Sequence, residues 1–408
     1  MISTVLCTDI GSSSLKTALL DKRGAVISYT KLHFDKLNLE NNNWLDYFIK
    51  ATNEVISKTK ENCQIQGICV SGNGPTVVSE TGKTLLWNDI SEIEMPYKTQ
   101  SLFIPRLYIH KRKYLKDWEK SKYIFSGPEY LIWKLTGEAV TILPDNRYIP
   151  AYWTKENLDS FEIDYSKLPN FVKPSTMVGL LKNDLTEKMN INKVPVFAGA
   201  PDFIVALLGT NTLSSGSICD RAGSSEGINL CLDINPLTKN INSNLLKDIR
   251  ILPGILPNMY NLSYLIPDSG IRFSSYKKSI APEMSYEDFV ISLLKKDTTN
   301  NEGFVLMCEI GKEVKQGLDR LEKICLELGY KMPYAIRTSG GQAQNHSWLS
   351  FKSTIINYPI EVTTCADSEL TGNSILAWYG LKEFDSIQQA ANEIVKISKT
   401  FYPNPSFL

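Results

Sequence analysis

Three short segments, far apart in the chain, join an apolar run to a turn of glycine and serine. Asp9–Ser14 has the sequence Asp-Ile-Gly-Ser-Ser-Ser, Ala222–Ser225 has Ala-Gly-Ser-Ser, and Ser339–Gly341 has Ser-Gly-Gly. Small residues at such turns let backbone N–H groups approach an anion closely. Three such turns predict a site for the phosphates of a nucleotide. The residues assigned to nucleotide binding are Gly11, Ser12, Ser13, Ser14, Lys16, Gly223, Ser224, Ser225, Gly340, Gly341, Gln342 and Asn345.

Two carboxylates could do chemistry beside these turns. Asp9 is either a turn residue that closes a hairpin or a ligand of Mg²⁺, which prefers one or two carboxylates plus phosphate oxygens. Arg221 stands at the matching position in the second half of the chain, which favours the metal role, because one metal needs only one carboxylate. Asp202 is either an ordinary helix-start carboxylate or a general base that takes a proton from a sugar hydroxyl. Lys16 is either a neutralising charge beside phosphates or an exposed strand lysine.

The elements that must position these residues follow from turn chemistry and hydrophobic spacing. Turn residues at two corners predict an antiparallel meander at the start of the chain. Apolar residues at helical spacing predict a helix after it. The expected strands are Ser3–Thr8, Leu15–Leu20, Ala25–Phe34, Ile65–Val70 and Lys193–Ala198, and the expected helices are Leu45–Lys58 and a segment beginning at Asp202.

The second half of the chain repeats features of the first. Thr8–Asp21 can be laid on Asp220–Asp233 with five of fourteen positions identical, including the Gly-Ser-Ser turn. Val196–Asp202 and Ala335–Gly341 form a second echo, because both join a strand to a helix through a loop of small residues. We therefore predict two similar α/β lobes. They are 1–211, with the sugar, the phosphates and the catalytic base, and 212–408, with the nucleotide.

Composition excludes several classes of function. The 408 residues carry 44 basic and 44 acidic side chains, so neither nucleic acid nor a membrane surface is an expected partner. No apolar run approaches the roughly 18 residues of a membrane span, and the first residues lack the pattern of a signal peptide. The eight cysteines include no Cys-x-x-Cys pair, which is typical of reduced thiols in a cytoplasmic protein. Three histidines without metal-ligand spacing predict no histidine-based metal site.

In collinear order these segments resemble the FGGY carbohydrate kinases, part of the superfamily of actin, hexokinase and the heat-shock chaperone ATPases. Each matching segment is short, and the specificity lies in their order along most of the chain. The segments are Asp9–Lys16 (phosphate hairpin), Ile68–Pro75 and Trp87–Asp89 (sugar contacts), Tyr130–Leu131, Leu135–Glu138, Gly199–Gly209 (catalytic base), Gly223–Ser225, Ser339–Asn345 (adenosine side) and Glu369–Ala377.

The resemblance implies two ribonuclease H-like, actin-type ATPase lobes, each a mixed sheet flanked by helices, with a cleft between the lobes. It also implies ATP-dependent phosphorylation of a hydroxyl on a small sugar, ketose or polyol, similar to the reaction of xylulose kinases. Asp202 would be the general base, and Asp9 would organise Mg²⁺. A homodimer is a possible oligomeric state. The residues that would contact the sugar are Asn73, Gly74, Pro75, Trp87 and Asp202.

The chain also departs from the family pattern. It is shorter than the family usually is, and Gly74 and Pro75 offer no side-chain donors in the sugar loop. Glu129 replaces an Asp, Ser339 replaces a frequent Asp, and Lys352–Ile356 lacks an Ala-Asp-Val pattern. These departures leave an alternative open, a sugar or nucleotide sensor without phosphotransfer. A filament-forming or chaperone-like ATPase of the same superfamily is a third, less favoured reading.

Overall fold

The computed structural model of the protein describes residues 1–35, 42–60, 62–295 and 301–405. These residues form two compact units. The predicted lobes were each one continuous stretch, whereas the structure assigns a late segment of the chain to the first unit. Unit 1 is Met1–Val205 with Glu369–Ile394, and unit 2 is Ala206–Ser368 with Val395–Leu408.

The centre of unit 1 is a mixed six-stranded sheet with the order β10-β11-β4-β1-β2-β3. The strands β1, β4 and β11 are parallel, and the other three run antiparallel to their neighbours. The predicted meander and both later strands are confirmed, with ends that differ by a few residues. The bounds are β1 Ile2–Ile10, β2 Ser14–Asp21, β3 Val26–His33, β4 Cys63–Gly72, β10 Met177–Leu180 and β11 Pro195–Pro201.

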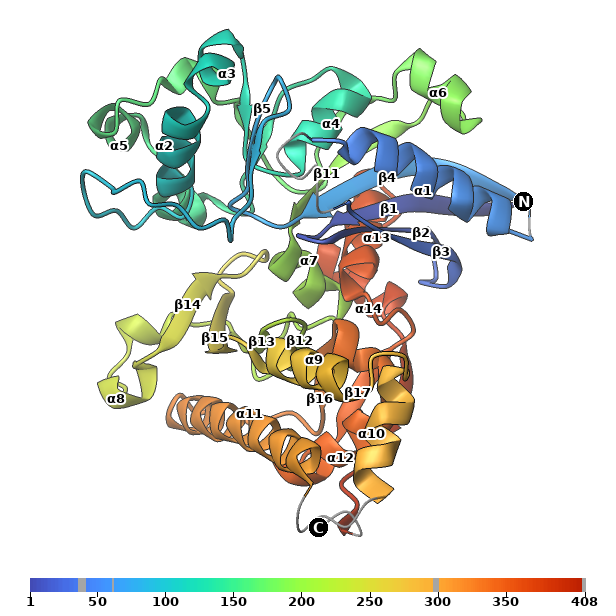
Figure 1. The fold of residues 1–408 in the computed structure, drawn as a ribbon, viewed down its shortest axis with the longest axis vertical. Helices are drawn as coiled ribbons and strands as arrows, with labels where there is room; N and C mark the ends of the chain where they lie inside the picture. Colours follow the sequence, from blue (N-terminus) through green and yellow to red (C-terminus); the bar gives the residue numbers. More distant parts are fainter. Residues whose placement is uncertain (36–41, 61, 296–300, 406–408) are drawn as a thin grey trace. The chain divides into compact units, whose positions relative to one another are not determined.

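One face of this sheet is apolar and is covered by α1 (Trp44–Lys58) (Figure 1). Because successive strand residues point to opposite faces, Ile10 and Leu15 share a buried core with Phe48 of this helix. Asp9 is adjacent to Ile10, and Lys16 is adjacent to Leu15. The alternation of side chains along a strand therefore places Asp9 and Lys16 on the opposite face of the sheet. The helix predicted from its apolar spacing is confirmed to within one residue at its start.

The opposite face of the sheet contacts α13 (Ser368–Gly380). A methyl group on Gly372 would lie 2.0 Å from the carbonyl oxygen of Val205, and one on Gly380 would lie 2.6 Å from the ring of Phe197. Val205 belongs to α7 (Asp202–Gly209) and Phe197 to β11, so α13 approaches both that helix and the sheet more closely than a side chain at either glycine would allow. This close packing is the reason that Glu369–Ile394 is part of unit 1.

Smaller elements complete unit 1. Short strands form a three-stranded and a two-stranded sheet beside the main one. The strands are β5 Val77–Ser79, β6 Thr84–Leu85, β7 Ile124–Phe125, β8 Thr141–Ile142 and β9 Phe171–Val172. The helices are α2 Ile104–Lys113, α3 Leu115–Lys120, α4 Glu129–Thr136, α5 Lys155–Ser160, α6 Asn183–Met189 and α14 Ile387–Ile394, with α7 Asp202–Gly209 at the change of unit.

Unit 2 is built on a mixed seven-stranded sheet with the order β14-β15-β13-β12-β16-β17-β18. Its strands are β12 Ile218–Ala222, β13 Glu226–Leu232, β14 Ile249–Pro253, β15 Tyr260–Ile266, β16 Ile336–Ser339, β17 Ile360–Thr363 and β18 Ile397–Phe401. Its helices are α8 Ser243–Leu246, α9 Ser269–Ile280, α10 Tyr286–Lys295, α11 Glu302–Glu327 and α12 His346–Ile356. The long helix α11 and its neighbours α10 and α12 pack together against this sheet (Figure 1) and form its core.

The first predicted echo between the halves corresponds to a structural repeat. In each unit an antiparallel hairpin, β1–β2 or β12–β13, is followed across the sheet by two parallel strands, β4 and β11 or β16 and β17. Ile10 pairs with Leu15 and Ala222 pairs with Glu226, so the second turn is one residue shorter. Asp9 and Arg221 therefore do occupy matching positions.

The second predicted echo was wrong. Val196–Asp202 contains β11, which is separated from β1 by β4, whereas Ala335–Gly341 contains β16, which is directly beside β12. The counterpart of β11 is therefore β17, and that of β16 is β4. A strand, a small loop and a helix have the same local pattern wherever they occur in a parallel sheet, so the pattern did not reveal which strand was which.

Candidate active site

Asp9 lies at the end of β1, where three parallel strands finish together. Asp9 is in register with Ser71 of β4, and Gly72 is in register with Pro201 of β11, the residue before Asp202. Strand register thus places the two predicted chemical carboxylates at one edge of the unit 1 sheet. The sequence could predict each strand end, but the alignment of the ends required the pairing.

A chain of hydrogen bonds holds the Asp9 carboxylate. The hydroxyl of Ser71 donates to Asp9 Oδ1 at 2.8 Å. Asn373, on α13, donates its amide N–H groups to Ser71 Oγ at 2.7 Å and to the carbonyl oxygen of Thr8 at 2.9 Å. The carboxylate is therefore oriented by a helix that lies more than 350 positions further along the chain.

The electrostatic surroundings of Asp9 favour its protonated form. Asp9 is 3% exposed. Burial raises the pKa of Asp9 to about 7, and the negative charges of Glu369 and Asp202 act in the same direction. The ammonium group of Lys16 and the hydrogen bond from Ser71 oppose that shift of the pKa. Because Asp202 acts on Asp9 in this way, the two carboxylates lie within electrostatic reach of each other.

Lys16 is the cation of this group. It is in register with Asp9 on the neighbouring strand β2, and its Nζ lies 3.7 Å from Glu369 Oε2. The surroundings are mostly buried, since the side chains of Lys16 and Glu369 are 15% and 6% exposed. Lys16 is therefore not an exposed strand lysine, which was the alternative left open by the sequence.

Asp202 is the first residue of α7 and is half-buried. Its Oδ1 accepts a hydrogen bond of 2.7 Å from the backbone N–H of Phe203. A carboxylate at the first turn of a helix is favoured by the partial positive charge of that helix end. The predicted helix start is confirmed, and the position suits both the structural and the catalytic reading of this residue.

Three of the predicted sugar and phosphate residues meet at one hydroxyl. Ser12 Oγ accepts hydrogen bonds from Asn73 Nδ2 at 2.7 Å and from Trp87 Nε1 at 2.8 Å. Asn73 is buried, whereas Trp87 is 43% exposed. Gly74 is exposed and Pro75 is half-buried. The sugar loop and the phosphate hairpin are thus directly joined in unit 1.

The rest of the first phosphate hairpin is a tight turn. The backbone N–H of Gly11 donates to the carbonyl oxygen of Ser14 at 2.9 Å. A methyl group on Gly11 would lie 3.2 Å from that same oxygen, so a glycine suits this position. Ser13 is exposed at the tip, and Ser14 is buried. Ser12 and Ser13 are therefore better placed than Ser14 to reach a ligand with their side chains.

The corresponding turn of unit 2, Gly223–Ser225, is supported by α9. Gly223 and Ser224 are exposed. The backbone N–H of Ile271 donates to the carbonyl oxygen of Ser224 at 3.0 Å. A methyl group on Gly270 would lie 1.9 Å from the carbonyl oxygen of Gly223. The turn is thus exposed to solvent at Gly223 and Ser224, and its backbone packs against the start of α9.

The third predicted turn depends on Gly340. Its φ of 88° and ψ of −168° belong to a region that essentially only glycine occupies. A methyl group there would lie 2.5 Å from the carbonyl oxygen of Ala222, next to the second turn. Gly341 is exposed, and a methyl group on it would meet nothing within 4 Å. Gly340 is therefore required by the backbone conformation, whereas Gly341 leaves free space at the surface.

Gln342 and Asn345 both precede the first residue of α12. Gln342 is in a short 3₁₀ turn, Gly341–Gln344, and Asn345 is the N-cap of the helix. Asn345 Oδ1 accepts the N–H of Trp348 at 2.8 Å, and Asn345 Nδ2 donates to the carbonyl oxygen of Tyr286 at 3.0 Å. Asn345 thus uses its amide group to start α12 and to hold the first residue of α10.

Reasoning from the sequence missed several residues that shape these sites. Ser71, Glu369 and Asn373 surround Asp9. In the sequence they stood out only as members of longer segments that resemble the family, and no role was assigned to any of them. Lys352 is a buried lysine that contacts the carboxylates of Asp220 and Glu226 in unit 2. The sequence offered one signal for the cluster of Lys352, Asp220 and Glu226, namely a lysine at an apolar position of a helix.

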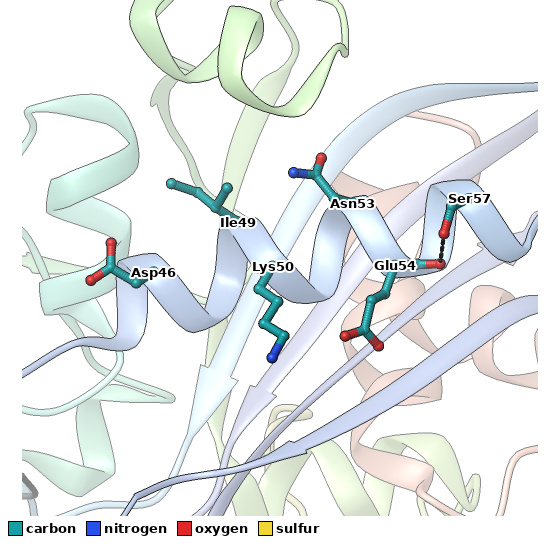
Figure 2. Close-up of a pocket in the computed structure, with 6 residues that line it drawn as sticks. All are labelled: Asp46, Ile49, Lys50, Asn53, Glu54 and Ser57. Carbon is teal, nitrogen blue, oxygen red and sulfur yellow. Dashed lines mark hydrogen bonds between the residues drawn. The ribbon is translucent and has the colours of Figure 1, made fainter.

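A surface hollow lies elsewhere, along the outer side of α1. Figure 2 shows its lining side chains spread along the helix, with Ser57 donating to the backbone carbonyl of Glu54. The hollow includes none of the predicted site residues. We assign it no role in the chemistry. Its lining residues are Asp46, Ile49, Lys50, Asn53, Glu54 and Ser57.

The residues around Asp9 fit a divalent cation. Asp9, Asp202 and Glu369 together with Lys16 would have an excess of two negative charges when ionised, which one Mg²⁺ would balance. Among the described residues no group of three or more His, Cys, Asp or Glu side chains is arranged to hold a metal by itself.

The repeated mixed sheets define the class of protein. Each unit has an antiparallel hairpin, two parallel strands beyond it and helices against the sheet. This is the fold of sugar kinase structures of the actin-like ATPase type. A glycerol kinase of Plasmodium falciparum, solved with ADP, matches with a TM-score of 0.75 at 17% identity, over 98% of this chain and 94% of that one. The predicted fold class is confirmed.

Curated relatives extend over nearly the whole chain. Xylulose kinase of Staphylococcus epidermidis is 23% identical over 473 residues, covering 98% of this chain and 92% of that protein. L-fuculokinase of Escherichia coli is 21% identical over 485 residues, covering 99% and 98%. No family model matches the chain. The predicted resemblance is nevertheless confirmed, because relatives named xylulose kinase, L-fuculokinase and glycerol kinase match nearly the whole chain.

Two further findings concern predictions made from the sequence. The alignment with xylulose kinase is longer than the chain itself, so parts of that relative have no counterpart here. Within the described residues, every helix is too short or too polar to cross a membrane.

Proposed function

We propose that this protein transfers the γ-phosphoryl group of ATP to a hydroxyl of a small sugar, ketose or polyol, as a xylulose kinase-like enzyme. The observation that carries the proposal is the placement of Asp9 and Asp202 at one strand edge of unit 1, within electrostatic reach. Relatives named for the phosphorylation of xylulose and fuculose support it. The reaction would use cytoplasmic ATP, in keeping with the location predicted from the cysteines.

Asp202 is the proposed general base. Its carboxylate takes the proton of the acceptor hydroxyl as that oxygen forms its bond to the γ-phosphorus. The bond from that phosphorus to the bridging oxygen breaks, and ADP leaves with the electron pair. A positioned base contributes typically 10²–10⁴-fold to such a rate. Half-burial at a helix start keeps the carboxylate both fixed and reachable.

Asp9 and Lys16 are proposed to act on the phosphates. Asp9 would hold Mg²⁺ through water, and the ion, when bound, neutralises charge on the phosphates. Ser71 and Asn373 keep the Asp9 carboxylate in one orientation. Lys16 adds a positive charge on the neighbouring strand. Gly11 would shape this turn, and backbone and hydroxyl donors would come from Ser12, Ser13 and Ser14 in unit 1.

Unit 2 is proposed to bind the remainder of the nucleotide. The exposed turn Gly223–Ser225 offers backbone N–H groups to phosphates, and Gly340 lets its own loop approach that turn. Gly341 leaves open space for a ligand, and Gln342 lies next to it. Asn345 would act on the nucleotide indirectly, by fixing the start of α12.

Asn73, Trp87, Gly74 and Pro75 are proposed to line the sugar. Asn73 and Trp87 present N–H donors, which in this structure bond to Ser12. Gly74 and Pro75 contribute shape, because neither has a side-chain donor. A panel of pentuloses, hexuloses and polyols is therefore the right way to find the acceptor.

The test of this proposal is the variant Asp202→Asn in an assay of sugar-dependent ADP release. The purified protein is incubated with Mg²⁺, ATP and each member of the panel. We expect the wild type to turn over at least one sugar and the variant to lose at least 100-fold in kcat, with unchanged melting temperature. Turnover by the variant at the wild-type rate would remove Asp202 as the base.

A second candidate function is a sensor that binds a sugar or nucleotide without transferring phosphate. The altered sugar loop favours it, since Gly74 and Pro75 offer no side-chain donors there. Calorimetry with Mg²⁺ and ATP, combined with a thermal-shift screen of the same panel, separates the two. Binding without ADP release across the whole panel would favour the sensor.

A further inference from the structure

Unit 2 contains three charged side chains that are completely buried together. Lys352 of α12 donates from Nζ to Asp220 Oδ2 and to Glu226 Oε1. All three side chains are 0% exposed. We call Lys352, Asp220 and Glu226 the buried ion triad. Of these three residues, Lys352 lies where the chain departs from the family pattern, in the helix after the third glycine turn.

The triad surrounds the second predicted phosphate turn. Asp220 is on β12 two residues before the end of that strand, and Glu226 is the first residue of β13. Only Gly223–Ser225 separates the two strands, and Ala222 pairs with Glu226 at the base of the turn. The carboxylates thus hold both sides of the hairpin, and Lys352 joins both to one helix.

The same cluster reaches Gln342. Its amide Nε2 donates to Glu226 Oε2 at 3.3 Å, and its Oε1 accepts from Trp348 Nε1 at 2.6 Å. The Lys352 ammonium lies 5.9 Å from the centre of the Trp348 ring. Lys352 and Trp348 are one helical turn apart on α12. A continuous polar connection therefore runs from the turn, through the triad, to the side chain of Gln342.

Burying three ionisable side chains together carries a large cost in desolvation free energy. Removing charges from water costs free energy, and apolar residues of similar size often stabilise a protein as well or better. Burial, with the charge of Glu226 next in importance, raises the pKa of Asp220 to about 8. Burial acts to raise the pKa of Glu226, but the charge of Lys352 and the hydrogen bonds from Asp220, Lys352 and Ser269 together outweigh burial, so the net shift is downward. Packing alone does not call for these residues, whereas defined hydrogen-bond directions do.

We propose that the buried ion triad is a set of positioning residues that fixes Gly223–Ser225 and Gln342 for the phosphates of a nucleoside triphosphate. The inference rests on nucleotide binding by unit 2, one part of the proposed function. The triad does not touch the nucleotide. It acts by holding the turn and Gln342 in one geometry, so its loss weakens ATP binding more than it affects the sugar.

Two variants of the full chain test this inference. Lys352→Met removes the shared donor and leaves two buried carboxylates. The triple variant Lys352→Met, Asp220→Asn and Glu226→Gln keeps similar shapes but removes every charge, so it folds even if the single variant does not. Glu361→Gln is the matched control, because it removes an ion pair between Arg337 and Glu361 in the same sheet.

The primary measurement is the Kd of ATP with Mg²⁺, by calorimetry, at a temperature at which circular dichroism shows each variant to be folded. We expect the triple variant to melt within a few degrees of the wild type and to bind ATP at least fivefold more weakly. The single variant, if folded, loses at least tenfold. The control binds within twofold of the wild type. With an active sugar in hand, KM for ATP rises and KM for the sugar stays within twofold.

A folded triple variant that binds ATP within twofold of the wild type overturns the inference and makes the triad purely structural. Absence of ATP binding by the wild type overturns it as well. The inference and the proposed reaction fail separately. A wild type that binds ATP but phosphorylates no sugar rejects the kinase, while the binding comparison still decides the role of the triad.

Discussion

Trp87 and Ser12 are joined by a hydrogen bond of 2.8 Å from the indole Nε1 to the hydroxyl oxygen. One residue comes from the predicted sugar segment and the other from the predicted phosphate hairpin. The bond gives the two segments a direct physical connection inside unit 1. A ligand that binds to one of these segments can therefore change the position of the other.

The first prediction concerns this bond. Trp87→Phe keeps an aromatic ring but removes the N–H donor, and Ser12→Ala removes the acceptor. Because Trp87 is 43% exposed, we expect the free energy of unfolding to change by less than about 0.5 kcal/mol for Trp87→Phe. We expect kcat/KM for the sugar to fall about threefold to tenfold.

A double-mutant cycle on kcat/KM isolates the bond itself. A coupling of roughly 0.5–1.5 kcal/mol between the two substitutions is expected for one neutral hydrogen bond. Strictly additive effects would show that the two side chains act independently in solution.

The second prediction concerns the support of Asp9. Asn373→Ala removes the donors to Ser71 and to the carbonyl oxygen of Thr8. Leaving buried acceptors unsatisfied costs roughly 1–3 kcal/mol, and we expect the free energy of unfolding to fall by that amount. Loss of the oriented Ser71 hydroxyl lowers kcat about tenfold.

Ser374→Ala is the matched control for this prediction. Ser374 is buried on the same helix, and the described residues provide no hydrogen-bond partner for its hydroxyl. We expect little change in unfolding by urea or in kcat. An effect of Ser374→Ala as large as that of Asn373→Ala would point to general disturbance of α13 instead.

The third prediction compares two adjacent glycines. Gly340→Ala forces a methyl group toward the carbonyl oxygen of Ala222 in a backbone conformation that alanine rarely adopts. We expect a loss of about 2 kcal/mol or more in the free energy of unfolding. Gly341→Ala meets open space, and its effect on stability is expected to be under about 0.5 kcal/mol. Equal melting temperatures for the two variants would contradict this assignment.

The fourth prediction is a dependence of stability on pH. Burial raises the pKa of Glu129 to about 7, although its Oε1 accepts hydrogen bonds from Ile142 N–H and the Ser126 hydroxyl. Its ordinary value is 4.5. Between these values the folded protein holds a proton that the unfolded chain releases, so stability falls as pH rises through this window.

Glu129→Gln removes this titration while keeping an oxygen acceptor. Chemical denaturation at pH 5 and pH 8 is expected to show a smaller loss for the variant than for the wild type, by up to about 3 kcal/mol. Identical losses in both proteins would mean that Glu129 is ionised in the folded state at pH 5.

Much of the site could be predicted because the necessary patterns are local. The hairpin around Gly11 and the carboxylate at the start of α7 depend on a few neighbouring residues, whose turn and capping preferences act over short distances. The order of these segments along the chain was enough to indicate the class of protein.

The partners of Asp9 could not be predicted in the same way. Ser71 reaches it through the register of parallel strands, and Asn373 through a helix that returns to the first sheet. The second echo was misassigned for a related reason, because strands of a parallel sheet share a local pattern whatever their place in the order.

The sequence by itself determined the turns, the two similar halves and the identity of the acidic groups, since these follow from residue type and spacing. Only the tertiary structure decided that Asn373 orients Asp9 and that Lys352 joins Asp220 to Glu226. Such contacts depend on which faces of distant elements pack together, and that choice is made by burial over the whole unit instead of by any short segment.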